Sequence, residues 1–217
     1  MDLTNKRIAH YQVENEIGQG GMATIYYAID QRDNSEVALK VLLPHLARDL
    51  VVLRRFQKEG ENGQRLRHPN ITRVVEWGEA EGYHYMALRY ASKGSLDRLL
   101  QRRKQRKTPM PVEEAIALLR PVAAALDYAH GKGILHRDIK PSNVLIDEDE
   151  QVLLSDFGIA RRLDPTATQL TMTHTTVGTP AYMSPEQAEG DRDIDARADI
   201  YSLGVMAYEM LTNELPF

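Results

Sequence analysis

The sequence predicts an α+β fold with two lobes, in which a small antiparallel β-sheet lobe with one helix precedes a larger, mainly helical lobe. Two observations predict this division. Short β-branched and aromatic runs, separated by Gly, Asp and Asn turn signals, fill the first ninety residues. From Ser95 onward, apolar residues recur at helical spacing instead. The pattern changes near Arg89 to Gly94, so we place the N-lobe at 11–90, a hinge at 91–94 and the C-lobe at 95–217.

The first lobe is expected to hold several strands and one helix, after an N-terminal tail over residues 1–10. Its helix is expected over about 50–66 and contains Gly60 and Gly63, each of which costs about 1 kcal/mol relative to alanine. We therefore expect a mobile helix whose inward, ion-paired position needs ATP or a partner to stabilise it. The expected strands are residues 11–17, 24–30, 36–42, 71–77 and 83–89, the last two around a turn at 80–82.

The second lobe is expected to contain two long helices. The first covers 112–130, ends at Gly131, and carries Pro121, which predicts a local kink. The second covers 196–211 and is apolar over most of its circumference, which predicts burial.

Two runs of charge interrupt this pattern. The basic run at 101–107 is interpreted as a solvated helix end and loop, with a docking patch for an acidic partner as the alternative. The acidic run at 147–150 is interpreted as an exposed turn between two short strands.

Composition narrows the class of protein. With 42% apolar and 27% charged residues, the chain has the balance of a soluble globular protein. A net charge of −4 argues against a nucleic-acid binder, and the absence of cysteine excludes disulfides, thiolate catalysis and cysteine-ligated zinc. No secretory signal and no run of roughly 18 apolar residues is present. We therefore expect these 217 residues to be cytoplasmic and without membrane contact of their own, with a membrane span downstream as the open alternative.

Two short motifs carry the chemistry. The first runs from His136 to Asn143, with the sequence His-Arg-Asp-Ile-Lys-Pro-Ser-Asn, and the second is Asp-Phe-Gly from Asp156. Together they supply two carboxylates, one amide and one ammonium. Phosphoryl transfer needs an acidic group that orients a hydroxyl and hard oxygen ligands that hold magnesium beside the phosphates. Taken alone, Asp138 is also interpretable as a capping aspartate.

In this order, the two motifs resemble those of the eukaryotic-like Ser/Thr protein kinases, particularly their bacterial branch. The resemblance implies a protein-kinase-like two-lobe fold and transfer of the γ-phosphoryl group of ATP to Ser/Thr hydroxyls of proteins. It also implies that Asp138 receives the hydroxyl proton, that Lys140 neutralises the moving group, and that Asn143 and Asp156 bind Mg²⁺, with Mn²⁺ as the alternative.

The resemblance further implies structural roles for two residues near this chemistry. The His136 ring is expected to be buried against Phe157 of the Asp-Phe-Gly motif. Asp199 is expected to anchor the catalytic-loop backbone from the helix over 196–211, with a helix-start aspartate as the alternative.

A Gly-rich turn lies between the first two strands and is expected to bind the phosphates of the nucleotide. Glycines allow backbone amides to approach phosphate oxygens and accept positive φ, although an isolated turn of this kind is more often structural. Ala23 stands where the family has a third glycine. The resemblance implies a nucleotide site built from Ile17, Gly18, Gly20, Gly21, Ala23, Ile25, Ala38, Lys40, Leu88, Arg89, Ala91 and Leu145.

Lys40, at the end of Val-Ala-Leu-Lys on the third strand, matches the lysine that binds the α- and β-phosphates in the family. Alone, it is equally a lysine at a sheet edge. Its expected partner is a glutamate on the following helix. We choose Glu59, with Glu61 as the rival.

The segment between Asp156 and Glu186 is rich in threonine, with seven between Thr166 and Thr179. Composition alone indicates a polar loop. The resemblance implies an activation segment in which Arg137 recruits a phosphothreonine and Thr179 contacts the catalytic residues. Autophosphorylation is expected at one or more of Thr171, Thr173, Thr175 and Thr176. A homodimer, in which one copy phosphorylates the other, is the expected assembly for this reaction.

The resemblance covers the chain from about Tyr11, but the family pattern continues with further helices after Phe217, so an incomplete C-lobe is expected. Two alternatives stay open beside a protein kinase. One is an ATP-binding signalling module without catalysis. The other is a small-molecule kinase, which the long threonine-rich segment disfavours because it suits a polypeptide acceptor.

Overall fold

The computed structural model describes residues 1–157, 179–191 and 193–217. The chain divides into two compact units. The first comprises Met1–Arg67 and Thr72–Ala91, and the second comprises His68–Ile71 and Ser92–Phe217. Each unit is built around its own sheet.

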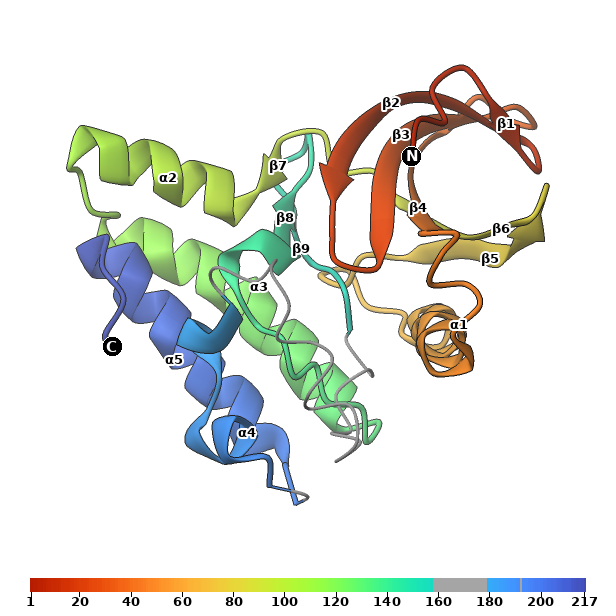
Figure 1. Cartoon of the computed structure of the whole chain (residues 1–217). Helices are drawn as coiled ribbons and strands as arrows, with labels where there is room; N and C mark the ends of the chain where they lie inside the picture. The colour runs from red at the N-terminus through yellow and green to blue at the C-terminus, as the bar shows by residue number, and fades with distance from the viewer. Residues whose placement is uncertain (158–178, 192) are drawn as a thin grey trace. The chain divides into compact units, whose positions relative to one another are not determined.

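The first unit is a curled antiparallel sheet with one helix against it, which confirms the expected lobe type (Figure 1). Its strands run in the order β1-β2-β3-β4-β6-β5. The elements are β1 (Arg7–Ile8), β2 (Tyr11–Gln19), β3 (Ala23–Asp30), β4 (Glu36–Leu42), α1 (Leu50–Arg65), β5 (Val74–Ala80) and β6 (Tyr83–Arg89). Only β5 departs clearly from expectation: it starts at Val74, and Ile71 belongs to the second unit, where it forms a parallel bridge with Leu154.

The β5–β6 hairpin shows how local sequence fixes register. Glu81 and Gly82 both have positive φ, at 50° and 77°. Two consecutive left-handed residues match the twist of antiparallel strands and form the tightest hairpin connection. The turn therefore pairs Ala80 with Tyr83 and sets the remaining partners of the two strands.

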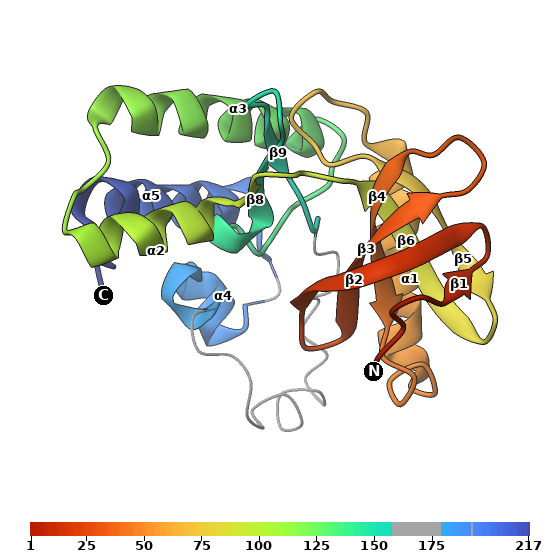
Figure 2. The same ribbon diagram turned by 90° about the horizontal axis from the view of Figure 1, so that it is seen from above.

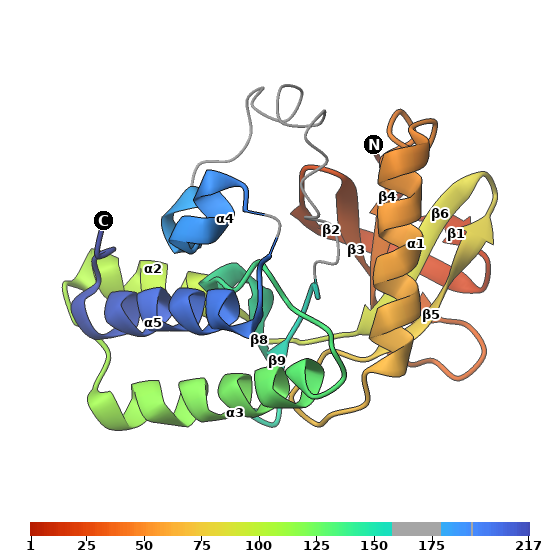
Figure 3. The same cartoon turned by 90° about the horizontal axis from the view of Figure 1, so that it is seen from below.

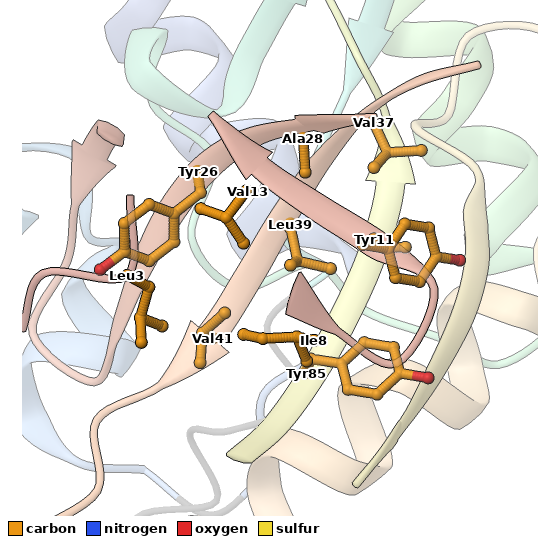
Figure 4. Close-up of a cluster of buried hydrophobic side chains, with 11 residues drawn as sticks. Leu3, Ile8, Tyr11, Val13, Tyr26, Ala28, Val37, Leu39, Val41 and Tyr85 are labelled. Atoms are coloured by element: carbon orange, nitrogen blue, oxygen red, sulfur yellow. The ribbon is translucent and has the colours of Figure 1, made fainter. Parts of the chain in front are cut away.

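Alternate residues of the strands point into the curl and form its core (Figure 4). This alternation explains why short β-branched and aromatic runs form these strands. Residues 1–10 are not a tail, which corrects the sequence-based expectation. Leu3 and Ile8 are fully buried in this core, and β1 pairs with β2. The inward side chains include Tyr11, Val13, Tyr26, Ala28, Val37, Leu39, Val41 and Tyr85.

Helix α1 begins at an N-cap aspartate and packs on β5 (Figure 3). Its two glycines lie at the contact. A Cβ at Gly60 would stand 2.6 Å from Cγ of Trp77, and one at Gly63 would stand 2.2 Å from Cγ2 of Val74. Both distances are too short for any side chain, so the glycines permit a close approach of helix and strand. Their cost in helix propensity thus has a packing cause that the sequence analysis did not foresee.

The second unit contains a small sheet, β7-β8-β9, and a group of helices in which α3 packs along α5 (Figures 1 and 2). Helix α3 has the expected bounds and continues through Pro121. The elements are β7 (Gly94–Ser95), α2 (Leu96–Arg106), α3 (Val112–His130), η1 (Pro141–Asn143), β8 (Val144–Ile146), β9 (Val152–Leu154), η3 (Thr179–Tyr182), α4 (Pro185–Glu189) and α5 (Ala196–Thr212).

Helix α5 is buried on one side only, which corrects the expectation of burial around most of its circumference. Val205, Met206 and Met210 are buried, whereas Ile200 and Tyr208 are 54% and 45% exposed. Within the described part of the chain, no helix combines the length and the apolar character that crossing a bilayer requires.

Candidate active site

The Gly-rich turn joins β2 to β3 in the first unit. The Gly20 amide donates to the Ala23 carbonyl at 2.8 Å, while a Cβ at Gly21 would meet nothing within 4 Å. The φ angles of Gly18, Gly20 and Gly21 lie outside the positive region, so the turn does not need glycine for its backbone conformation here. Small side chains leave its backbone open to a ligand, which is the property that phosphate binding uses.

Several of the residues expected at the nucleotide site occupy neighbouring strands of the first unit. Ala38 on β4 pairs with Tyr27 on β3 and with Leu88 on β6, and Ile25 pairs with Lys40. Three more expected residues lie near the ends of their elements. Ile17 is on β2 close to the turn, Arg89 is exposed at the end of β6, and Ala91 is buried at the end of the unit. Leu145 belongs to β8 of the second unit.

Lys40 and Glu59 form the ion pair that the sequence analysis expected. Lys40 Nζ lies 2.5 Å from Glu59 Oε1, and the two side chains are only 9% and 12% exposed. The rival Glu61 is exposed and lies 4.0 Å from Lys58 instead. A buried charged pair is kept together because each ion loses hydration and is stabilised mainly by the other. The pair therefore fixes α1 with Glu59 turned toward β4.

The catalytic loop brings two of the expected polar groups, those of Lys140 and Asn143, to Asp138. Lys140 Nζ lies 2.8 Å from Asp138 Oδ2. Asn143 Nδ2 donates to the Asp138 carbonyl at 2.7 Å and to Oδ2 at 3.2 Å. The short η1 turn produces this closeness, since it returns Asn143 toward the start of the loop. The carboxylate is thus held by two donors from its own loop.

Asp199 of α5 holds the backbone of the same loop, as expected. It is 1% exposed and accepts from the amides of His136 at 2.9 Å and Arg137 at 2.6 Å. It also lies 2.7 Å from Nε2 of His130, the last residue of α3. The sequence analysis missed His130, whose only signal is its place at a helix C-terminus. One carboxylate therefore ties α3, α5 and the loop together.

His136 is structural, in agreement with the expectation. It is fully buried, and its ring centroid lies 4.8 Å from that of Phe157. Burial lowers the pKa of His136, which keeps the ring neutral. Its Nε2 lies 2.8 Å from the Ser155 carbonyl and therefore carries the proton, so Nδ1 accepts from the Asp138 amide at 3.3 Å. The neutral ring thus links the Asp138 backbone to the strand that precedes Asp156.

The donor set of Asn143 and Asp156 fits a hard divalent cation. The Ser155 amide donates to the Asn143 carbonyl at 2.8 Å, which brings the neighbouring Asp156 beside Asn143. Because Nδ2 of Asn143 faces Asp138, its Oδ1 is the atom left for a metal. Over residues 1–157, 179–191 and 193–217, no cluster of three or more His, Cys, Asp or Glu is suited to a metal. A cation here would therefore need further oxygens from phosphates or water.

Two residues of this site have a strained backbone conformation. Arg137 and Asp156 have φ of 65° and 55°, in the left-handed region that non-glycine residues rarely adopt.

Thr179, one of the threonines expected to have a regulatory role, begins η3. Thr171, Thr173, Thr175 and Thr176 lie outside the described residues.

Comparison with known proteins bears on the family of the chain. The family model described as "Protein kinase domain" matches residues 11–217. Serine/threonine-protein kinase PknB of Mycobacterium leprae is 40% identical over 211 residues, which are 95% of this chain and 33% of that protein. PknJ of Mycobacterium tuberculosis is 42% identical over 213 residues, or 96% of this chain and 35% of that protein. The chain therefore spans about a third of the length of these curated relatives.

A solved structure supports the same relationship. The PknI kinase domain of Mycobacterium tuberculosis, crystallised as a single-site mutant, superposes with a TM-score of 0.78 at 34% sequence identity. The match covers 100% of this chain and 80% of that chain. It confirms the expected fold class.

Proposed function

Because the chain belongs to the protein kinase family, whose members use ATP and a divalent metal, we propose that it is a serine/threonine protein kinase. The reaction is transfer of the γ-phosphoryl group of Mg-ATP to Ser or Thr hydroxyls of protein substrates. The observation that carries the proposal is the Asp138 carboxylate held by Lys140 and Asn143.

Asp138 is the group that receives the proton of the acceptor hydroxyl. Lys140 and Asn143 both contact Oδ2, so we assign Oδ1 to the acceptor hydroxyl. The Arg137 and His136 amides are fixed by Asp199, so the carboxylate has little freedom to turn away. A base positioned in this way contributes about 10²–10⁴ to the rate.

Lys140 supplies positive charge where the phosphoryl group meets the acceptor oxygen. Its ammonium, 2.8 Å from Asp138, stays close to the hydroxyl that Asp138 orients. In the ground state it balances the Asp138 carboxylate. As negative charge develops on the transferred group, the same ammonium stabilises that charge.

The nucleotide is held by residues of the Gly-rich turn, β3, β4 and β6, with Lys40 contacting its phosphates and Glu59 orienting Lys40. Asn143 and Asp156 hold the metal, for which we propose Mg²⁺, with Mn²⁺ as a substitute. A bound divalent ion neutralises phosphate charge and orients the γ-phosphoryl group. The nucleotide site that we propose comprises Ile17, Gly18, Gly20, Gly21, Ala23, Ile25, Ala38, Lys40, Leu88, Arg89, Ala91 and Leu145.

Regulation is proposed to act through the threonine-rich segment. Autophosphorylation at one or more of the four threonines between 171 and 176 adds negative charge that Arg137 can bind. Phosphorylation between two copies of the chain is the expected route. Intact-mass analysis and peptide mapping after incubation with Mg-ATP test this proposal, which fails if an active protein stays unmodified.

Phosphate transfer to a generic basic protein tests the function directly. Asp138→Asn keeps the shape of the side chain but cannot accept the proton, so transfer should fall by about 10²–10⁴ while ATP binding is retained. Equilibrium ATP binding is measured on the same samples. If the unmodified chain binds ATP but transfers no phosphate, it is an ATP-binding signalling module instead.

A further inference from the structure

Gln187 occupies the first turn of α4 and is almost completely buried. It forms a capping box with Ser184: the Ser184 amide donates to Gln187 Oε1 at 3.2 Å, and the Gln187 amide donates to Ser184 Oγ at 3.4 Å. This box uses the oxygen of the Gln187 side chain and fixes its rotamer. The amide nitrogen, Nε2, is directed away from α4.

Nε2 of Gln187 donates to the carbonyl of Arg137 at 2.9 Å, across a sequence separation of 50 residues. Arg137 is the left-handed residue immediately before Asp138. Its amide donates to Asp199 at 2.6 Å, so both polar groups of its backbone are held by side chains from other elements. A sparsely populated backbone conformation persists only where its surroundings determine it in this way.

Removing the Gln187 donor would release this conformation. The Arg137 carbonyl would lose the hydrogen bond from Gln187 in a partly buried setting, which removes one restraint on its positive φ. Because the Arg137 carbonyl belongs to the peptide whose amide is that of Asp138, a rotation there would turn the Asp138 backbone. The contact between that amide and His136 Nδ1, 3.3 Å long, would be lost with it.

Gln187 connects two segments, the loop that contains Arg137 and the segment formed by η3 and α4, and α5 holds both of them. Asp199 holds the catalytic loop, whereas Ser202 Oγ donates to the Tyr182 carbonyl of η3 at 2.6 Å. Tyr182 also donates its hydroxyl to Glu209 of the same helix. Gln187 is therefore a direct link between the segment that ends in η3 and α4 and the loop that carries Asp138.

We propose that Gln187 is a positioning residue for phosphoryl transfer: its Nε2 holds Arg137 in the left-handed conformation that orients Asp138. The inference rests on the proposed function for the role of Asp138. It assigns Gln187 to the rate of the chemical step and not to nucleotide binding.

Three variants of the full chain test the proposal. Gln187→Glu keeps the size and the acceptor oxygen of the side chain but cannot donate to Arg137 when ionised. Gln187→Met removes both functions. Ser184→Ala is the matched control, because it deletes the other side-chain hydrogen bond of the same capping box and leaves the Arg137 contact in place.

The proposal predicts that kcat falls about 10-fold or more in both Gln187 variants, while KM for ATP stays within about twofold. Ser184→Ala should lower Tm but keep kcat within about twofold of the unmodified chain. Gln187 variants with unchanged kcat, or an equal loss in Ser184→Ala, would overturn the assignment, because the box would then act only through stability.

Hydrogen exchange at the Arg137 and Asp138 amides gives a readout that does not need activity. Exchange there should accelerate in Gln187→Glu and Gln187→Met but not in Ser184→Ala. If the unmodified chain transfers no phosphate, the proposed function fails, and exchange alone decides whether Gln187 holds the loop. Unchanged exchange in both Gln187 variants refutes the inference.

Discussion

Replacing Gly63 of α1 with alanine should destabilise the first unit, although helix propensity alone favours the change by about 1 kcal/mol. The new Cβ would lie 2.2 Å from Cγ2 of Val74, a side chain that is only 6% exposed and cannot move into solvent. Overpacking of this kind costs about 1–3 kcal/mol. Subtracting the propensity gain from the overpacking cost gives a net loss of up to about 2 kcal/mol in unfolding free energy. Packing therefore makes the substitution destabilising.

The assay is urea unfolding followed by the fluorescence of Trp77, the single tryptophan of the chain, which lies beside α1. Gly204→Ala is the control, because Gly204 is an exposed position inside α5 and a Cβ there would meet nothing within 4 Å. Urea unfolding of Gly204→Ala, followed by far-ultraviolet circular dichroism, should show an unfolding free energy about 1 kcal/mol above that of the unmodified chain. A midpoint for Gly63→Ala above that of the unmodified chain would refute the packing argument.

Two further predictions concern charge. Glu59→Gln removes the carboxylate beside the buried Lys40 ammonium, so it should cost about 3 kcal/mol of unfolding free energy and abolish most phosphate transfer. Glu61→Gln is the control: it affects only the exposed pair with Lys58, 4.0 Å long, and should cost less than about 1 kcal/mol. Equal losses in urea unfolding would contradict this. His136 has a lowered pKa, so below about pH 6.5 the unfolded chain binds the extra proton and the unfolding free energy falls as pH drops, by up to about 1.4 kcal/mol per pH unit. His136→Gln should show a shallower slope between pH 7 and pH 5, and an unchanged slope would show that the buried imidazole is not responsible.

Much of the fold was predictable because its signals are local. The bounds of β4, β6 and α3 agree with the sequence analysis, since each is a strongly periodic run between clear turn residues. The Lys40–Glu59 pair was also predicted, because the helix expected after the Lys40 strand contains only two glutamates.

What could not be predicted depends on contacts between distant parts of the chain. The packing reason for Gly60 and Gly63 needs the position of β5, which no helical pattern reveals. His130 approaches Asp199 across 69 residues, and Gln187 approaches Arg137 across 50. Such pairs are set by tertiary packing, so the residues carry no distinctive local pattern.

Because Leu3 and Ile8 are buried, the folded domain begins before Tyr11. The family match begins at Tyr11, but a polypeptide shortened to that position would lose β1 and two side chains that close the inside of the curled sheet. The Val13 amide and carbonyl, which bond to Lys6 and Asn5, would lose those partners as well. Affinity tags and cleavage sites are therefore better placed ahead of Met1 on a spacer than at the boundary that homology suggests.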